Sequence, residues 1–135
     1  MEPKRLAGLE PASVFGYFEE ICSMPHGSGN TKQISDYLVN FAKEHHLEYL
    51  QDEALNVVIR KPATKGYEQV PGIILQGHMD MVAVKKPDSR IDMEKEPLKL
   101  KKEGDYIYAE NTSLGGDDGI AVAYALAILD AKDIP

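Results

Sequence analysis

The side chains best placed to do chemistry are those of His78 and Asp80, which a single methionine separates. They directly follow the apolar segment 72–77, which predicts a buried strand. Alternate residues of a strand project to the same side, so both side chains are expected at the edge where open α/β sheets build their sites. One imidazole nitrogen can then bind a metal while a carboxylate holds the other N–H. The alternative is a His and an Asp solvated in a loop.

A second cluster is Asp117-Asp118, which stands between Gly115-Gly116 and an apolar helix. The simpler interpretation of Asp118 is an N-cap, because carboxylates are favoured at the start of a helix. The two glycines permit backbone shapes that other residues resist, as is needed when a side chain must be aimed sharply. A carboxylate has two oxygens and can bridge two cations. Asp117 is therefore the candidate for a bridging metal ligand.

Other candidates carry less chemistry. The loop 27–29 resembles a phosphate cradle, but it lacks the lysine of a P-loop and follows no strand. Ser28 as a nucleophile lacks the sharp strand-to-helix turn that exposes such a serine. His45 and His46 are typical of a solvated helix end. Cys22 lies on an apolar helical face, which predicts core packing and not a reactive thiolate.

The periodicity of apolar residues predicts the elements that position these side chains. Two helices come first, one opened by Pro11 and ended by Met24-Pro25, the other running from Thr31 to the histidine pair. Strands are expected at 47–50, 55–60 and 72–77, a hairpin at 98–102 and 106–109, and an apolar helix at 120–131. The β-branched run 57–59 predicts a strand buried on both faces. The charged segment 84–97 predicts a surface excursion, and the whole pattern indicates an α/β fold.

Composition bounds the class of protein. The chain has 135 residues, 43% hydrophobic and 27% charged, which fits one globular domain or a piece of one. A net charge of -7 argues against nucleic acid and gives no support to an anionic membrane surface as partner. The longest apolar run, 120–129, is shorter than the roughly 18 residues of a membrane span. A lone cysteine, Cys22, and the lack of a signal-peptide pattern predict a cytoplasmic protein.

Two motifs together resemble a known family. Residues 73–82 read Ile-Ile-Leu-Gln-Gly-His-Met-Asp-Met-Val, and residues 111–121 read Asn-Thr-Ser-Leu-Gly-Gly-Asp-Asp-Gly-Ile-Ala. This pair resembles the aminoacyl-histidine (Xaa-His) dipeptidases, within the group of cocatalytic zinc peptidases that includes aminoacylases and glutamate carboxypeptidases. The segments 25–30 and 86–97 also look like that subfamily, so the resemblance covers nearly the whole chain.

The resemblance implies a role for each candidate residue. His78 would be a ligand of one zinc ion, Asp80 would support that histidine as the catalytic carboxylate, and Asp117 would bridge two zinc ions. Manganese or cobalt are alternatives, since His and carboxylate ligands suit all three metals. A cis peptide often follows the bridging Asp in this group. Gly116 and Asp118 stand where relatives often have Ala and Asn, and neither departure removes a ligand.

The resemblance also implies the architecture and the function. Residues 1–135 would be the N-terminal part of a catalytic domain with an α/β/α layered fold and a mixed sheet. The lid and dimerisation domain, the remaining ligands and a general-base Glu would lie beyond this chain, which is then expected to be inactive alone. The full-length protein would be a homodimer that hydrolyses dipeptides. Alternatives are another amide hydrolase, such as an aminoacylase or tripeptidase, a non-catalytic binding protein, and a structural domain.

Overall fold

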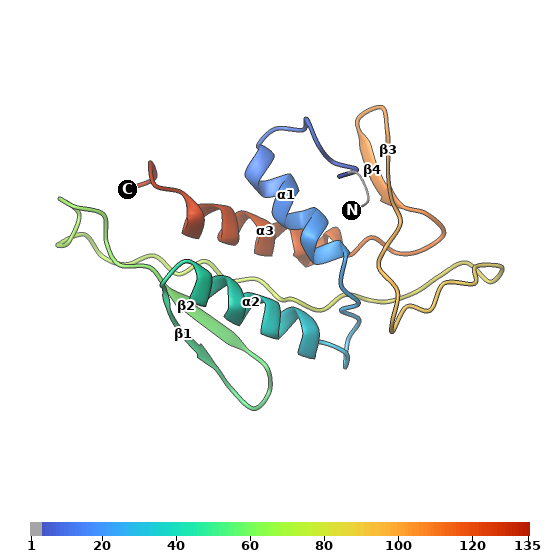
Figure 1. Ribbon diagram of the computed structural model, residues 1–135, viewed down its shortest axis with the longest axis horizontal. Helices are drawn as coiled ribbons and strands as arrows, with labels where there is room; N and C mark the ends of the chain where they lie inside the picture. The colour runs from blue at the N-terminus through green and yellow to red at the C-terminus, as the bar shows by residue number, and fades with distance from the viewer. Residues whose placement is uncertain (1–3) are drawn as a thin grey trace.

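The computed structural model describes residues 4–135, which form three helices and two separate antiparallel hairpins (Figure 1). The mixed α/β class predicted from the sequence is confirmed. The elements in chain order are α1 (Ala12–Cys22), α2 (Lys32–Glu44), β1 (Glu48–Gln51), β2 (Val57–Arg60), β3 (Leu100–Glu103), β4 (Tyr106–Ala109) and α3 (Gly116–Asp130).

The three helices meet along their apolar faces and form the core. α3 packs tightly on α1 at Gly119, where an added Cβ would lie 3.3 Å from the ring of Phe18. Cys22 is buried in this core, as its place on the apolar face of α1 predicted. The first two helices form near the predicted positions, and their buried residues are Val14, Phe18, Ile21 and Cys22 in α1, and Ile34, Ser35, Leu38, Val39, Phe41 and Ala42 in α2.

The last helix, α3, starts irregularly. Asp117 and Asp118 have non-helical backbone angles, so the regular helix begins at Gly119, close to the predicted start at residue 120. Its buried side includes Val122, Ala123 and Leu126, whereas Tyr124 on the other side is exposed. The apolar composition of α3 therefore exceeds what α1 and its other neighbours cover in this structure.

Each hairpin pairs two short strands. In the first, β1 and β2 are antiparallel with Leu50 opposite Val58. The prediction that this second strand is buried on both faces is wrong, because Val58 is 58% exposed while Val57 and Ile59 are half-buried. The reason is that the strands contact α2, whereas among residues 4–135 no other helix or strand packs extensively on their other face. The second hairpin, β3 with β4, forms as predicted.

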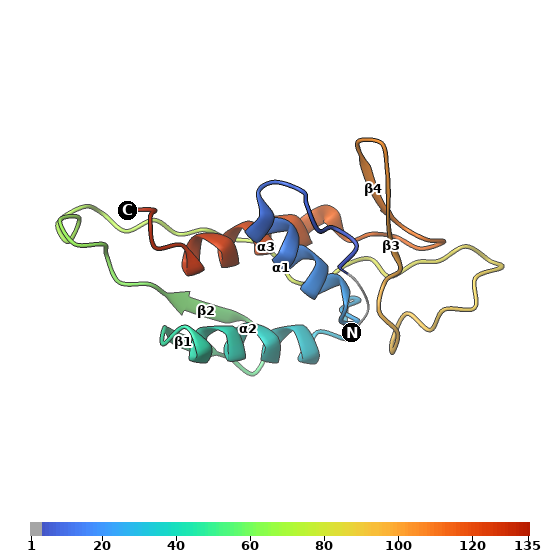
Figure 2. The same ribbon diagram turned by 45° about the horizontal axis from the view of Figure 1, so that its top comes forward.

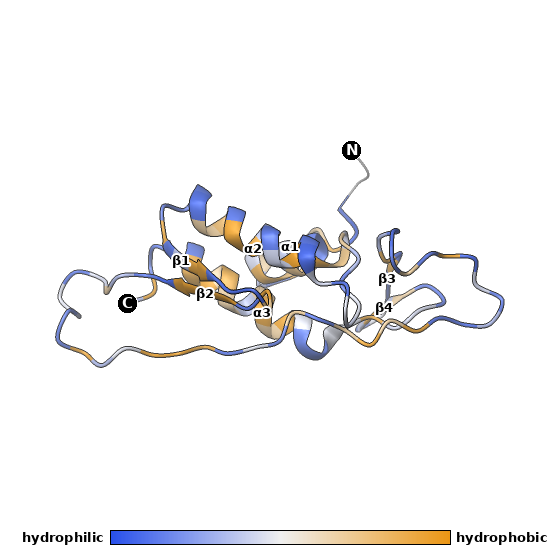
Figure 3. Ribbon diagram, turned by 90° about the horizontal axis from the view of Figure 1, so that it is seen from below, coloured by the Kyte–Doolittle hydropathy of each residue, from blue (hydrophilic) through white to orange (hydrophobic). Residues whose placement is uncertain are grey.

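The predicted buried strand at 72–77 does not form. The chain runs extended through this segment (Figures 1 and 2), but among residues 4–135 it has no hydrogen-bonded neighbouring strand. Ile73 and Ile74 are 86% and 92% exposed, and the segment is largely hydrophobic in Figure 3. A strand needs a neighbour to pair its backbone groups, and the described residues supply none here. Their two sheets are both antiparallel, so no mixed sheet is present in this part of the chain.

The segment 84–97 forms the irregular, mostly exposed excursion that its charge predicted, and it protrudes beyond the helices in Figure 2. Ile91 is buried within this segment, and the Lys85 ammonium donates a hydrogen bond to the Ile91 carbonyl at 2.6 Å. Within residues 4–135, no helix has the length and apolar character needed to cross a membrane.

Candidate metal centre

The structure brings His78 and Asp117 together from positions 39 residues apart. His78 Nε2 lies 3.1 Å from Asp117 Oδ1, within the separation expected of two ligands of one ion. The first residue ends the extended segment 72–77, and the second stands in the irregular start of α3. His78 therefore does not stand alone in a loop, because the carboxylate of Asp117 faces its ring.

Asp118 joins these two segments through the backbone. Its Oδ2 accepts a hydrogen bond from the main-chain N–H of His78 at 3.2 Å. The N-cap interpretation of Asp118 is wrong, because α3 has no side-chain cap and this carboxylate faces the neighbouring segment instead. A Cβ on Gly77 would lie 2.9 Å from the same Oδ2, so glycine allows the close approach. The Asp117–Asp118 peptide is cis, as the resemblance implied.

Asp80 lies on the other side of the His78 ring. Its Oδ1 and its carbonyl oxygen are 3.1 Å and 3.0 Å from His78 Nδ1. Carboxylates on both ring nitrogens favour the imidazolium, and the hydrogen bond to Asp117 raises the pKa of His78 above its ordinary value. In the neutral ring, Nδ1–H donates to Asp80 and the Nε2 lone pair points toward Asp117. A cation bound between Nε2 and Asp117 would take the place of the proton.

Ser28 holds the second oxygen of Asp80. Its hydroxyl donates a hydrogen bond of 2.5 Å to Asp80 Oδ2, and this bond is the main reason that the pKa of Asp80 is lowered. Sequence reasoning considered Ser28 only as a nucleophile or as part of a phosphate loop, and so missed this contact. Its partner lies 52 residues away, and no local spacing could have signalled it.

The site is open and its donor set is partial. The side chains of His78 and Asp117 are 54% and 95% exposed. Nitrogen and carboxylate oxygen are the donors that zinc accepts, so the residues fit the expected metal in type. Within residues 4–135, however, no group of three or more His, Cys, Asp or Glu side chains could hold a metal ion. Zinc takes three or four protein ligands, so these two residues would be one part of a coordination shell.

The other sequence candidates lie outside this centre. His45 stacks on Phe41, and its Nε2 lies 3.0 Å from Asp130 Oδ1, so it connects α2 to α3. His45 stands at the end of α2 as predicted, but its side chain is only 28% exposed, whereas His46 is exposed. Burial raises the pKa of Cys22 to about 12, which fits the predicted inert thiol.

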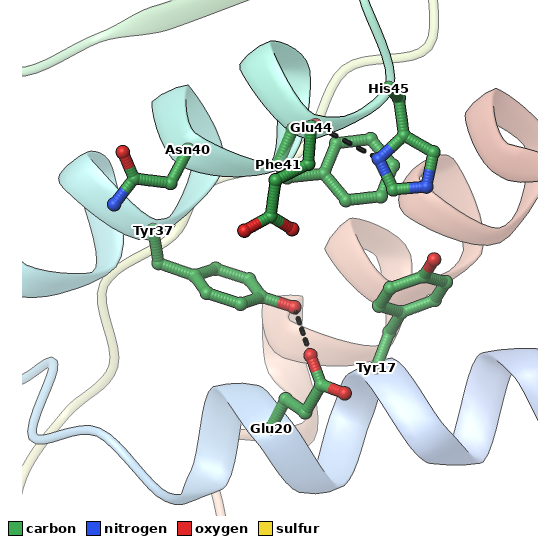
Figure 4. A pocket seen from close by; sticks show the side chains of 7 residues that line it. All are labelled: Tyr17, Glu20, Tyr37, Asn40, Phe41, Glu44 and His45. Carbon is green, nitrogen blue, oxygen red and sulfur yellow. Dashed lines mark hydrogen bonds between the residues drawn. The ribbon is translucent and has the colours of Figure 1, made fainter.

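A groove between α1 and α2 contains His45 but none of the candidate site residues (Figure 4). Its wall includes Tyr37, whose hydroxyl donates to Glu20 at 2.7 Å. Burial and this bond raise the pKa of Tyr37. The seven lining residues are Tyr17, Glu20, Tyr37, Asn40, Phe41, Glu44 and His45.

Comparisons with known proteins match the chain to peptidases that act on short peptides, by their names two dipeptidases and a tripeptidase. The chain is 39% identical over 129 residues to the cytosol non-specific dipeptidase of Escherichia coli K12, covering 96% of this chain and 27% of that protein. The solved aminoacylhistidine dipeptidase from Vibrio alginolyticus superposes with a TM-score of 0.92 and 38% identity over 96% of this chain and 26% of that chain. A solved tripeptidase from Staphylococcus aureus superposes with a TM-score of 0.69 and 27% identity. This match covers 87% of this chain and 31% of that chain.

The chain spans about a quarter of the length of the two dipeptidases that it matches. No family model matches the sequence. In both sequence and fold, the chain is similar to one part of the aminoacylhistidine dipeptidases, which confirms the resemblance that its His-Met-Asp and Gly-Gly-Asp-Asp motifs predicted.

Proposed function

We propose that the full-length protein hydrolyses dipeptides at a site with two zinc ions, for which His78 and Asp117 are ligands. The observation that carries this proposal is the 3.1 Å approach of His78 Nε2 to Asp117 Oδ1. The names of the matched relatives, two dipeptidases and a tripeptidase, support peptides as the substrate class.

Each residue has a distinct task in this proposal. Asp80 accepts the Nδ1 proton of His78, which fixes the tautomer and leaves the Nε2 lone pair free to bind the metal. Asp117, whose carboxylate is 95% exposed, would hold the same ion and would be free to bind a second one. When bound, the metal pair would supply Lewis acidity at the scissile carbonyl and at the attacking water. The remaining ligands and the general-base Glu are proposed to lie outside these 135 residues.

Substrate range, metal and assembly belong to the same proposal. Xaa-His or broad dipeptide specificity is favoured by the two dipeptidase matches, and a tripeptidase is the second candidate because of the third match. Assays of the full-length protein on Xaa-His dipeptides, tripeptides and N-acyl amino acids separate these activities from an aminoacylase. Zinc is proposed ahead of manganese or cobalt. A cytoplasmic homodimer is proposed, with no nucleic-acid or membrane partner, in line with the net charge of -7.

The test uses the full-length protein with His78→Ala and Asp117→Ala. Both variants should lose metal-dependent dipeptide hydrolysis and bound zinc, while circular dichroism stays like that of the wild type. The matched control is His46→Ala, because His46 is an exposed histidine outside the site. Near-normal activity and zinc content in either site variant would show that the ligand assignment is wrong. Zinc binding without hydrolysis in the wild type would favour the non-catalytic binding protein.

A further inference from the structure

The two carboxylate oxygens of Asp80 have different hydrogen-bond partners, one on each side of the group. Oδ1 lies 3.1 Å from His78 Nδ1, whereas Oδ2 accepts the 2.5 Å hydrogen bond from the hydroxyl of Ser28. Bonds of this length between a hydroxyl and a carboxylate are the charge-assisted kind, about twice as strong as neutral ones. Asp80 is only partly buried, so without Ser28 its Oδ2 would turn to water.

Ser28 is itself held firmly in front of Asp80. Its main-chain N–H donates to the carbonyl of Met81 at 3.0 Å, and the N–H of Met81 donates to the carbonyl of His26 at 3.0 Å. Gly27 lies between these bonds, where an added Cβ would be 2.8 Å from Ala83 Cβ. The loop that bears Ser28 is therefore held by two main-chain hydrogen bonds to Met81, the residue that follows Asp80.

We propose that Ser28 is a positioning residue of the metal site, which acts by fixing the rotation of the Asp80 carboxylate. The last torsion of an aspartate is broad, so a carboxylate with one bonded oxygen can turn away from its partner. The Ser28 hydroxyl restrains that rotation and keeps Oδ1 on His78 Nδ1. The imidazole plane, and with it the direction of Nε2 toward Asp117, follows from this restraint. This inference rests on the proposed metal-binding function.

The expected size of the effect follows from the distance of Ser28 from the ion. Outer hydrogen-bond partners of metal ligands typically contribute 10–100-fold in metal affinity. Ser28 acts through Asp80, one bond further out, so we expect a loss of about tenfold, at the lower end of that range. A nucleophilic role is a different reading of the same residue, but here the hydroxyl proton is directed at an acceptor carboxylate and not at a histidine base.

The experiment measures zinc affinity of the full-length protein by competition with a chromophoric chelator, together with kcat and KM. Ser28→Ala should bind zinc about tenfold more weakly, and Ser28→Thr, which keeps the hydroxyl, should restore most of the affinity. The control is Ser23→Ala, which removes an exposed hydroxyl at the end of α1 that donates to the Glu20 carbonyl, away from the metal site. Urea unfolding should show that all three variants remain folded under the assay conditions, so that a change in zinc affinity reports on the site and not on loss of the fold.

A double variant tests whether Ser28 acts through Asp80. In an Asp80→Ala background, Ser28→Ala should cause no further loss of zinc affinity. A further tenfold loss in that background, or wild-type affinity in Ser28→Ala alone, would overturn the inference. Asp117→Ala keeps this outcome separate from failure of the proposed function. If that variant still binds zinc normally, the metal site itself is wrong, and if it loses zinc while Ser28→Ala does not, only the role of Ser28 is wrong.

Discussion

At the scale of single residues, the arrangement around His78 assigns different jobs to chemically similar carboxylates. Asp117 faces Nε2, Asp80 faces Nδ1, and Asp118 accepts a hydrogen bond from the main-chain N–H of His78. The first is placed to share a metal with the ring, the second to orient the ring, and the third to hold the backbone. Substitutions at these positions should therefore differ in kind as well as in size.

The Asp80→Ala variant tests how much the orientation of the His78 ring contributes to metal binding. Removal of the carboxylate leaves the Nδ1 proton with the Asp80 carbonyl oxygen as its one protein acceptor among the described residues. Some zinc should remain bound, with affinity or rate lowered by about 10–100-fold. Zinc titration and steady-state kinetics of the full-length protein check this, and an unchanged affinity and rate would remove Asp80 from the mechanism.

A second residue-scale prediction concerns His26. Its ring is 2% exposed, Nδ1 donates to the Met24 carbonyl at 2.7 Å, and Nε2 has no hydrogen-bond partner among the described residues. Burial lowers the pKa of His26 below its ordinary value of 6.5. Between that lowered pKa and 6.5 the unfolded chain binds more protons than the folded chain, so the free energy of unfolding should decrease as the pH falls below 6.5.

Urea unfolding at pH 7.5, 6.5 and 5.5 measures this effect. The wild type should lose stability across the acidic step, and His26→Phe should lose less, because phenylalanine does not titrate. The comparison of slopes isolates His26 from the other groups that titrate in this range. Equal pH dependence in the two proteins would contradict the assignment.

At the scale of elements, the sequence predicted what depends on near neighbours. The helical spacing of Ile34 and Leu38 reports one face of α2 whatever covers it, and the hairpin of β3 with β4 follows from a short polar turn. The exposure of Val58 and Ile74 depends on which layers lie beside them, and the β-branched runs carry no information about that. The approach of His78 to Asp117 was implied by the resemblance of their two motifs to those of a family with a shared metal site, whereas the Ser28 contact depends on how a loop packs.

The junction between the 72–77 segment and α3 makes an element-scale prediction. In Gly77→Ala, the new Cβ would lie 2.9 Å from Asp118 Oδ2 and 3.5 Å from Ala121 Cβ. The Asp118 carboxylate can rotate away, but it then gives up the hydrogen bond from the His78 N–H. We expect zinc affinity of the full-length protein to fall severalfold while the helices keep their circular dichroism.

The matched control is Gly72→Ala in the same segment, where an added Cβ meets no atom within 4 Å. Both changes add one methyl group to the same extended stretch, so they differ only in what the methyl meets. Equal zinc affinities in the two variants would show that the contact between Asp118 and His78 does not position the metal ligands.

At the scale of the whole molecule, the described residues form a buried core of their own but supply only part of the candidate metal site. The helices bury a continuous apolar cluster, so this part of the structure has its own source of stability. The extended segment, by contrast, leaves Ile73, Ile74 and Leu75 exposed with no neighbouring strand among the described residues. Exposed apolar residues on an unpaired extended segment favour association with another chain.

A polypeptide of these 135 residues alone should therefore hydrolyse no dipeptides and should self-associate. Two converging ligands are fewer than the three or four protein ligands of zinc sites, so zinc binding should be weak. Light scattering with size exclusion should show oligomers that Ile74→Lys reduces, because a charge on the exposed segment opposes pairing. The contrary result is a monomeric polypeptide whose peptidase activity is lost in His78→Ala. That result would mean that the described residues complete the site by themselves, and it would overturn the assignment of His78 and Asp117 as only part of a larger coordination shell.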